Sequence, residues 1–355
     1  MFALIRLLFK PPEIPRAPDE IIDWRGSTLY FVFNAIAVAG PFLLLSFLPF
    51  WHAILVSAVF ALLLYTLACK KKTWETTAGI LLVTHAAILL SLPSPSDFLV
   101  LLSMDICFVL FFVRLFFVHT GHHIYFSHTG FRTGRLSQCV LAFVTEMALQ
   151  KGVLQWASNH RDHHTWSDTP KDPHTPKKGF WWSHVGWIMS PKYADYRSTR
   201  VLRDFGQFPE IVWLDRWYVV PPSILGILVF LLGFAWGGWV GGISTLIVGF
   251  FFSTFLVWHW TYAINSFAHV FGTVNYKITP EDTSKNTPAL RATAGEQNHN
   301  NHHRHEKSVR FALFDGEEDW AYPIIKWLER IGIIWDLHEP TPEQIQKGFL
   351  EPRTT

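Results

Sequence analysis

The feature that most constrains this chain is a series of long apolar blocks separated by basic segments. Each block is long enough, or nearly so, for a helix to cross the hydrocarbon core of a bilayer. The blocks are residues 29–48, 51–68, 77–92, 98–118, 223–238 and 240–260. A soluble protein of 355 residues usually carries more charge than 16% and fewer aromatic residues than 16%. We therefore expect an all-α integral membrane protein.

The distribution of Lys and Arg predicts which side of the membrane each connection faces. Three stretches contain neither residue: 29–69, 77–113 and 217–260. Lys and Arg concentrate instead in the N-terminus, in residues 70–72, in residues 119–222 and after residue 261. By the positive-inside rule these basic segments face the cytoplasm. The prediction is about six transmembrane helices in three hairpins, with both termini cytosolic.

This topology divides the chain into five parts. They are a cytosolic N-terminal segment (1–28), two transmembrane hairpins (29–118), a cytosolic helical cap (119–222), a third hairpin (223–260) and a cytosolic C-terminal region (261–355). The formal charge of +2 is too small to suggest a nucleic-acid partner. The three cysteines show no CxxC spacing, so we expect free thiols.

Nine of the 18 histidines form four groups, all outside the apolar blocks and all on the predicted cytosolic side. Two groups share the spacing HxxHH, which on a helix places three imidazoles on one face. Two metal ions with four or five ligands each would use all nine rings. The groups hold His123 and His128; His160, His163 and His164; His269; and His299, His302 and His303.

Solvated surface histidines are the ordinary alternative to a metal site. The repeat of HxxHH beside membrane blocks argues against that alternative. Imidazole suits zinc, copper, iron and nickel. Nine ligands exceed what tetrahedral zinc sites need, and no thiolate pair is present. A pair of iron ions with open positions for oxygen fits the number of ligands better.

The motifs HHIYFSH, NHRDHH, NSFAH and GEQNHNNHH together resemble those of integral-membrane fatty acid desaturases of the stearoyl-CoA desaturase type, which act on acyl-CoA or acyl-lipid at the delta-9 position. The likeness runs from about Phe98 to about Pro340 and includes the stretch DTPKDPHTPKKGFWWSHVGW. It implies an oxidoreductase that introduces a cis double bond, delta-9 by default, into a long saturated acyl chain. The implied cofactors are two iron ions (Fe2+/Fe3+), with O2 as co-substrate and water as its product.

The resemblance also implies a role for each histidine. One iron would bind His123, His128, His160, His164 and His302, and the other would bind His163, His269, His299 and His303. Asn265 would reach the second iron through a water molecule. In the first group a competing pair, His119 and His123, has the HxxxH spacing of related hydroxylases. We prefer His123 and His128, because GHHIYFSH aligns better with the desaturase motif.

Other polar residues receive weaker predictions. Four carboxylates lie close enough in sequence to the histidine groups to orient the metal ligands: Asp162, Asp168, Asp172 and Glu296. For each of them, a plain surface role is an equal alternative. The remaining histidines are expected to lie near the metal or on the surface: His122, His174, His184, His259, His305 and His338. Within the membrane, His85 and Asp105 lie equally far from the turn near Pro95. A contact between them would tether that hairpin.

An acyl chain that reaches a cytosolic metal site needs a closed apolar tunnel, and Trp156, Trp260 and Tyr262 are candidates to line it. The substrate could be a long-chain acyl-CoA, acyl-lipid or acyl carrier protein. Electrons would come from a separate cytochrome b5, ferredoxin or reductase. The membrane would be the inner or plasma membrane in a bacterium and the endoplasmic reticulum in a eukaryote. The alternatives are a membrane di-iron hydroxylase of a lipid, alkane or sterol, and a non-enzymatic metal transporter or lipid receptor.

Overall fold

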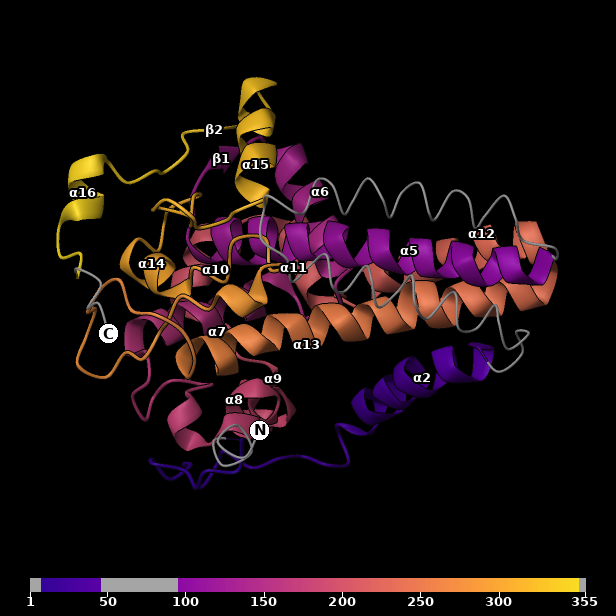
Figure 1. Ribbon diagram of the computed structural model, residues 1–355, viewed down its shortest axis with the longest axis horizontal. Helices are drawn as coiled ribbons and strands as arrows, with labels where there is room; N and C mark the ends of the chain where they lie inside the picture. Colours follow the sequence, from indigo (N-terminus) through magenta and orange to yellow (C-terminus); the bar gives the residue numbers. More distant parts are fainter. Residues whose placement is uncertain (1–7, 46–94, 351–355) are drawn as a thin grey trace. The chain divides into compact units, whose positions relative to one another are not determined.

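The structure of the protein, a computed structural model, describes residues 8–45 and 95–350 (Figure 1). The chain forms two compact units. The histidine unit comprises Met1–Ser27, Arg114–Pro221 and Trp258–Thr355. The apolar unit comprises Thr28–Val113 and Pro222–Val257. The prediction of a mainly helical protein is confirmed, and the described residues contain one sheet, of two short antiparallel strands, β1 (Arg132–Thr133) and β2 (Ile334–Trp335).

The apolar unit is built from long helices with few polar side chains. Its elements are α2 (Thr28–Leu45), most of α5 (Pro95–Phe117), α12 (Val220–Ser244), η4 (Thr245–Phe252) and the start of α13 (Ser253–Ser266). Helix α2 packs on the π-helical segment η4, where the rings of Phe33 and Phe251 lie 4.6 Å apart. A Cβ at Gly40 would collide with Ile247, so this contact depends on the absence of a side chain.

The chain reverses direction at Gly237–Gly238 inside the segment labelled α12. Gly238 has a φ of 56°, which favours glycine. On the two sides of the reversal, Thr245 Oγ1 donates to Val229 O at 2.9 Å. A Cβ added to Gly233 would lie 2.4 Å from the carbonyl oxygen of Gly241, so the two backbones approach closely. Between Val229 and Thr245 the two sides of the reversal therefore run antiparallel and in close contact.

Within the described residues, two helical stretches are long and apolar enough to cross a membrane, Leu102–Ser127 and Val220–His269, the second of which contains the reversal at Gly237–Gly238. A shorter apolar helix covers Thr28–Leu43. The predicted blocks 51–68 and 77–92 lie outside the described residues. His85 lies there too, so the contact proposed between His85 and Asp105 stays a prediction. The six-helix topology, the orientation of the termini and the five-part division also stay predictions.

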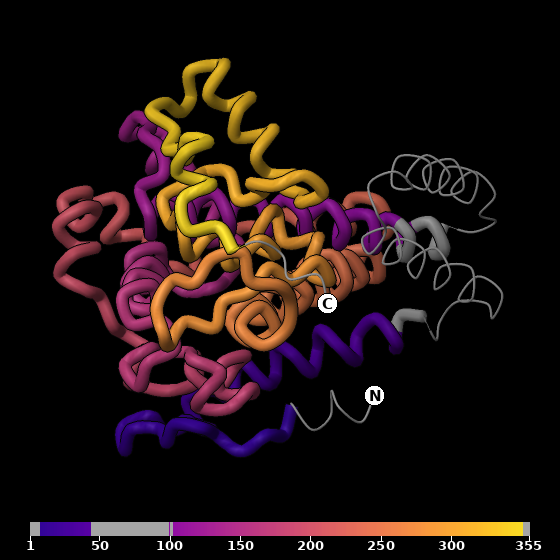
Figure 2. Tube along the Cα trace, turned by 60° about the vertical axis from the view of Figure 1, so that its left-hand side comes forward, coloured from indigo at the N-terminus to yellow at the C-terminus, as the bar shows by residue number. Residues whose placement is uncertain are grey.

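The histidine unit consists of many short helices (Figure 2). Its largest hydrophobic core joins several of them, and two smaller clusters lie around Ile264 and Tyr276. Phe126, Leu154, Ile211, Phe311 and Ile325 are almost fully buried together in the largest core. The elements in chain order are η1 (Val118–Ser127), β1, α6 (Arg135–Glu146), α7 (Val153–Trp166), η2 (Pro176–Lys178), α8 (Phe180–His184), η3 (Gly186–Met189), α9 (Pro191–Ala194), α10 (Thr199–Phe205), α11 (Pro209–Arg216), η5 (Phe267–His269), η6 (Pro288–Leu290), α14 (His299–Arg304), α15 (Ala321–Arg330), β2 and α16 (Pro342–Gln346).

The N-terminus of α7 is capped by buried carboxyl groups from other helices. Its N-cap is Gly152, which has no side chain to accept the first free N–H groups. Asp215 of α11 accepts from Leu154 N at 2.8 Å and from Gln155 N at 3.0 Å. Glu146 at the end of α6 accepts from Val153 N at 3.1 Å. These bonds fix the start of the helix that carries three of the nine histidines.

We predict that Asp215→Ala destabilises the histidine unit. The variant leaves two buried N–H groups without an acceptor, and each lost buried partner costs about 1 to 3 kcal/mol. Thermal unfolding of the purified protein should show a clearly lower Tm. Asp195→Ala is the matched control, because the Asp195 side chain is fully exposed. An unchanged Tm for Asp215→Ala would show that α7 does not need this cap.

Glu146 makes stability depend on pH. Burial raises the pKa of Glu146 from 4.5 to about 8, and the neighbouring Asp215 carboxylate adds to the rise. The folded protein therefore binds a proton that the unfolded chain releases, so this contribution is lost as pH rises toward the folded pKa. We predict that Tm falls less steeply between about pH 5 and about pH 9 in Glu146→Gln than in the unaltered protein. Parallel Tm profiles would contradict the assignment.

Candidate metal centre

The first histidine pair is positioned by a π-helix. Residues five apart are paired in a π-helix, because its backbone bonds run from i to i+5. Segment η1 ends at Ser127, whose Oγ donates to His122 O, five residues back, at 2.7 Å. His123 lies in η1 and His128 directly follows it, with their ring centroids 5.1 Å apart. The π-helix thus brings the two histidines of the HxxxxH spacing to the same side of the helix, which an α-helix would not do.

The two HxxHH groups lie on α-helices, as the spacing predicts. Helix α7 carries His160, His163 and His164, and α14 carries His299, His302 and His303. His269 is the last residue of η5, just after α13. The structure brings the nine rings into two clusters, in each of which one nitrogen per ring lies within 4.8 Å of the others. The clusters are His123, His128, His160, His164 and His302, and His163, His269, His299 and His303.

Within each cluster the rings face one another through the same atom, Nε2. In the five-histidine cluster, His302 Nε2 lies 2.8 Å from His123 Nε2 and 2.9 Å from His164 Nε2. His128 and His160 face each other at 2.9 Å. In the four-histidine cluster, His299 Nε2 lies 3.0 Å from Nε2 of both His269 and His303, and His163 Nε2 lies 3.2 Å from that of His303.

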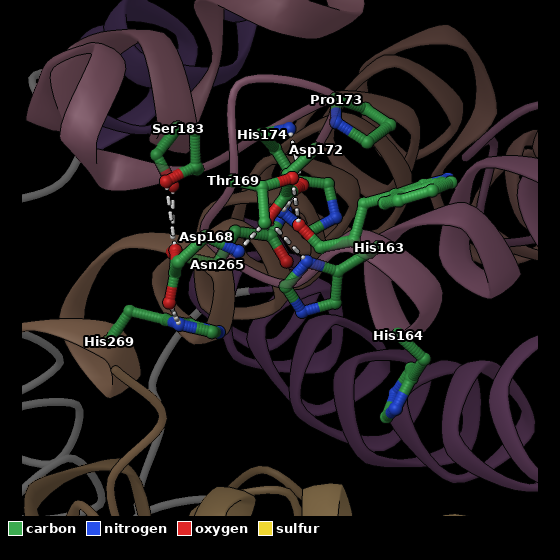
Figure 3. A network of polar contacts seen from close by, with 12 residues as sticks. His163, His164, Asp168, Thr169, Asp172, Pro173, His174, Ser183, Asn265 and His269 are labelled. Carbon is green, nitrogen blue, oxygen red and sulfur yellow. Dashed lines mark hydrogen bonds and ion pairs between the residues drawn. The ribbon is translucent and has the colours of Figure 1, made fainter. Parts of the chain in front are cut away.

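Carboxylates hold the outer nitrogens of four of these rings. In the four-histidine cluster, Nδ1 of His163 donates to Asp172 at 2.9 Å, and Nδ1 of His269 donates to Asp168 at 2.9 Å (Figure 3). Nδ1 of His303 donates to Asp282 at 2.8 Å. In the five-histidine cluster, Nδ1 of His123 donates to Glu296 at 2.5 Å. With the proton on Nδ1, each ring turns the lone pair of Nε2 toward its cluster.

Burial favours the neutral form of most of these imidazoles, and most of the carboxyl partners stay ionised. There are two exceptions. Burial would lower the pKa of His269, but the adjacent Asp168 raises it instead, and burial raises the pKa of Asp172. Burial lowers the pKa of His128 and His160 well below the ordinary value. Burial alone would raise the pKa of Glu296, but His123 and His119 reverse the shift and lower it to about 2. The histidines at Asp282 likewise lower its pKa. Neutral imidazole beside an ionised carboxylate is the usual arrangement of a histidine metal ligand.

These observations fit metal binding. Two lone pairs that face each other at about 3 Å repel, and a cation between them converts the repulsion into coordination. All nine donors are imidazole nitrogens, which suit iron, zinc, copper or nickel. The arrangement can therefore hold two metal ions, one in each cluster. The two clusters divide the nine histidines in the way that the family resemblance implied.

A small cavity adjoins both clusters inside the histidine unit. Its volume is about 40 Å³, room for a few water-sized molecules. Trp156 lines the cavity and stacks on His160, with ring centroids 4.8 Å apart. Trp260 and Tyr262 are not among the residues that line it. Asn265 lines it beside both clusters, and its backbone carbonyl accepts from Ser183 Oγ. The lining residues are Leu115, Val118, His119, His123, Trp156, His160, His163, Thr261, Ile264, Asn265, Thr293, Glu296 and His299.

Sequence reasoning identified some of the orienting carboxylates and missed one. Asp168, Asp172 and Glu296 each hold a ring of the clusters, whereas Asp162 is hydrogen-bonded to Tyr196. Asp282 was not predicted, since it lies 21 residues before its partner His303 in an irregular segment with no motif. Asp168 has a left-handed backbone conformation, with a φ of 57°. Aspartate tolerates this conformation, but the sequence gives no signal for it here.

The remaining histidines occupy varied surroundings. His119 lies outside the five-histidine cluster, and its Nδ1 lies 2.6 Å from Glu296. His122 is buried and stacks on Trp156, with ring centroids 5.2 Å apart. His174 is buried with its ring 4.2 Å from that of His163. Nε2 of His184 lies 3.1 Å from Nδ1 of His259. His305 is half-buried and His338 is exposed.

A chain that combines a buried, carboxylate-oriented set of imidazoles with long apolar helices fits the class of metal-dependent membrane enzymes. Residues 96–312 match the family model of fatty acid desaturases, and the chain belongs to this family. The family makes the protein an oxidoreductase, which excludes the transporter and receptor alternatives.

Individual relatives agree with the family. The chain is 35% identical over 243 residues to a hex-5-enoyl-(acyl-carrier protein) acetylenase of Moorena producens (strain JHB), covering 64% of this chain and 74% of the relative. It is 34% identical over 215 residues to an sn-1 stearoyl-lipid 9-desaturase of Anabaena variabilis, covering 60% and 75%. It is 33% identical over 230 residues to delta-9 acyl-lipid desaturase 2 of Arabidopsis thaliana, covering 64% and 72%.

We predict that Asp282→Asn weakens metal binding. An amide is a poorer acceptor for the His303 N–H than a carboxylate, and losing such a partner typically costs about 10- to 100-fold in affinity. Competition with a coloured chelator would measure the affinity of each metal. Asp315→Asn is the control, because Asp315 is exposed. Equal affinities in the two variants would show that Asp282 does not orient a ligand.

Proposed function

We propose that this protein is an oxygen-dependent acyl-lipid desaturase that introduces a cis double bond at the delta-9 position of a long saturated acyl chain. The observation that carries the proposal is the pair of clusters in which nine imidazoles converge through Nε2. Relatives named as 9-desaturases of stearoyl-lipid and acyl-lipid support the position of the double bond and a lipid as the group that carries the acyl chain.

The proposed ligands are the nine histidines of the two clusters. His123, His128, His160, His164 and His302 would hold one iron, and His163, His269, His299 and His303 would hold the other. Asn265 would contribute to the second through a water molecule, a role that its place in the cavity lining supports. When bound, the iron pair supplies the activation of O2 that allows hydrogen to be removed from two adjacent methylenes. Two electrons and two protons complete the reduction of O2 to two water molecules.

The protein's own contribution is to position the acyl chain and exclude water. An unactivated C–H bond offers nothing to an acid or a base, so placement of the methylenes decides which carbons react. Leu115, Val118, Trp156 and Ile264 give the cavity beside the clusters an apolar wall. We propose that the reacting methylenes lie against this wall. Burial of the ligand rings, with His302 1% and His163 1% exposed, keeps competing water away from them.

The membrane setting is part of the proposal. From the positions of the basic segments we propose that both termini and the active site face the cytosol. The proposed hairpins are at 29–118 and 223–260, and the proposed cytosolic parts are 1–28, 119–222 and 261–355. A separate electron carrier, such as a cytochrome b5, a ferredoxin or a reductase, would supply the electrons. Substrate would enter laterally from the bilayer, since its acyl chain already resides there.

Expression in a host that lacks the product tests the function. Gas chromatography with mass spectrometry of fatty-acid derivatives should show a new monounsaturated chain, and fragmentation should place the double bond at carbon 9. His303→Ala should abolish the product, because it removes a ring from the four-histidine cluster. His338→Ala, an exposed histidine, should leave the yield unchanged. A hydroxylated product would instead support the hydroxylase alternative, and equal yields from both variants would contradict the assigned site.

A further inference from the structure

An N-terminal segment outside the family match contacts the loop that follows the second histidine group. The segment, defined here as residues 10–27, precedes the matched residues 96–312. The backbone N–H groups of Glu13 and Ile14 donate to Lys177 O at 2.7 and 3.0 Å. Asp23 N donates to Met189 O at 3.0 Å. The N-terminal segment therefore forms part of the histidine unit.

The central contact is a buried ion pair. Lys178 Nζ lies 2.7 Å from Glu20 Oε1, and the two residues are 2% and 3% exposed. The Tyr193 hydroxyl also donates to Glu20. Taking two charges out of water costs several kcal/mol each, and an apolar pair of similar size often stabilises a protein as well or better. Stability alone is therefore a weak reason for charges at this place.

The ion pair reaches the four-histidine cluster through one residue. Lys178 Nζ also donates to the backbone carbonyl of Asp172 at 3.0 Å. The side chain of Asp172 in turn accepts from His163 Nδ1 at 2.9 Å and from Asp168 N at 2.9 Å. A continuous chain of contacts thus runs from Glu20 through Lys178 and Asp172 to a proposed metal ligand.

We propose that Glu20 and Lys178 are positioning residues that set the orientation of Asp172, and through it of His163, in the four-histidine cluster. The proposal rests on the proposed function of that cluster as one half of a two-metal site. Glu20 holds the Lys178 ammonium in place. Lys178 fixes the backbone of Asp172, so that the carboxylate keeps the proton of His163 on Nδ1 and its Nε2 free for metal. The N-terminal segment thereby completes the metal centre.

The test replaces both charges at once, so that no buried charge is left unpaired. Glu20→Leu combined with Lys178→Met keeps the volume and removes the donor to Asp172. We expect a Tm near that of the unaltered protein. Ferrous iron titrated against a chelator should bind about 10-fold more weakly at one of two sites, with the other unchanged. Mössbauer spectra of 57Fe-loaded protein should show one altered iron environment and one unaltered.

A matched control uses another ion pair of the N-terminal segment. Lys10 and Glu13 form that pair, and both side chains are exposed. Glu13→Leu with Lys10→Met should leave both iron affinities unchanged. If the Glu20/Lys178 double variant fails to fold, Glu20→Gln combined with Lys178→Met serves for the same comparison. It keeps an acceptor for the Tyr193 hydroxyl, leaves no unpaired buried charge and still removes the donor to Asp172.

The outcomes separate this proposal from the proposed function. Unaltered protein that binds no iron would contradict the two-metal site itself. Two irons in the unaltered protein and identical affinities in the double variant would overturn only the positioning role. Equal weakening of both irons together with a lower Tm would also overturn it, because that result shows general destabilisation.

Discussion

The structure depends on one arrangement, in which a buried carboxylate fixes the outer nitrogen of a histidine and so turns Nε2 inward. Asp168, Asp172, Asp282 and Glu296 each hold a ring in this way. The inward lone pairs approach to about 3 Å, a geometry that is unfavourable without a cation and favourable with one. Because all nine rings present the same atom, the two clusters offer imidazole nitrogen donors, which suit iron, zinc, copper or nickel.

The backbone is shaped to serve that arrangement. A π-helix brings His123 and His128 together across five residues, while α7 and α14 use ordinary helical spacing for the HxxHH groups. The start of α7 is held by carboxyl groups from two other helices, and the loop after it is held by the N-terminal segment. A desaturase acts on an unactivated C–H bond, which acid and base groups cannot polarise. Rigid placement of the substrate relative to the metal site therefore takes the role that acid and base groups have in other enzymes.

Much of the centre could be predicted from the sequence, because its spacings are local. The HxxHH repeats predicted which rings share a helix face, and family resemblance separated His123 and His128 from the competing His119. The sequence did not indicate the π-helix, since hydropathy and histidine spacing do not distinguish five-residue pairing from an irregular loop. Asp282 and the Glu20–Lys178 pair depend on contacts across 21 and 158 residues, which no local pattern encodes. Trp156 lines the cavity beside the clusters, and the tunnel roles of Trp156, Trp260 and Tyr262 stay predictions because the sequence does not show which space a ring faces.

The central claim is that nine imidazoles bind two iron ions in one chain. Iron quantification combined with X-ray absorption at the iron edge, on protein purified from iron-supplied cells, tests it most directly. We expect two irons per chain, each surrounded by nitrogen or oxygen neighbours and neither by sulfur. One iron per chain, no iron, or a sulfur neighbour would contradict it.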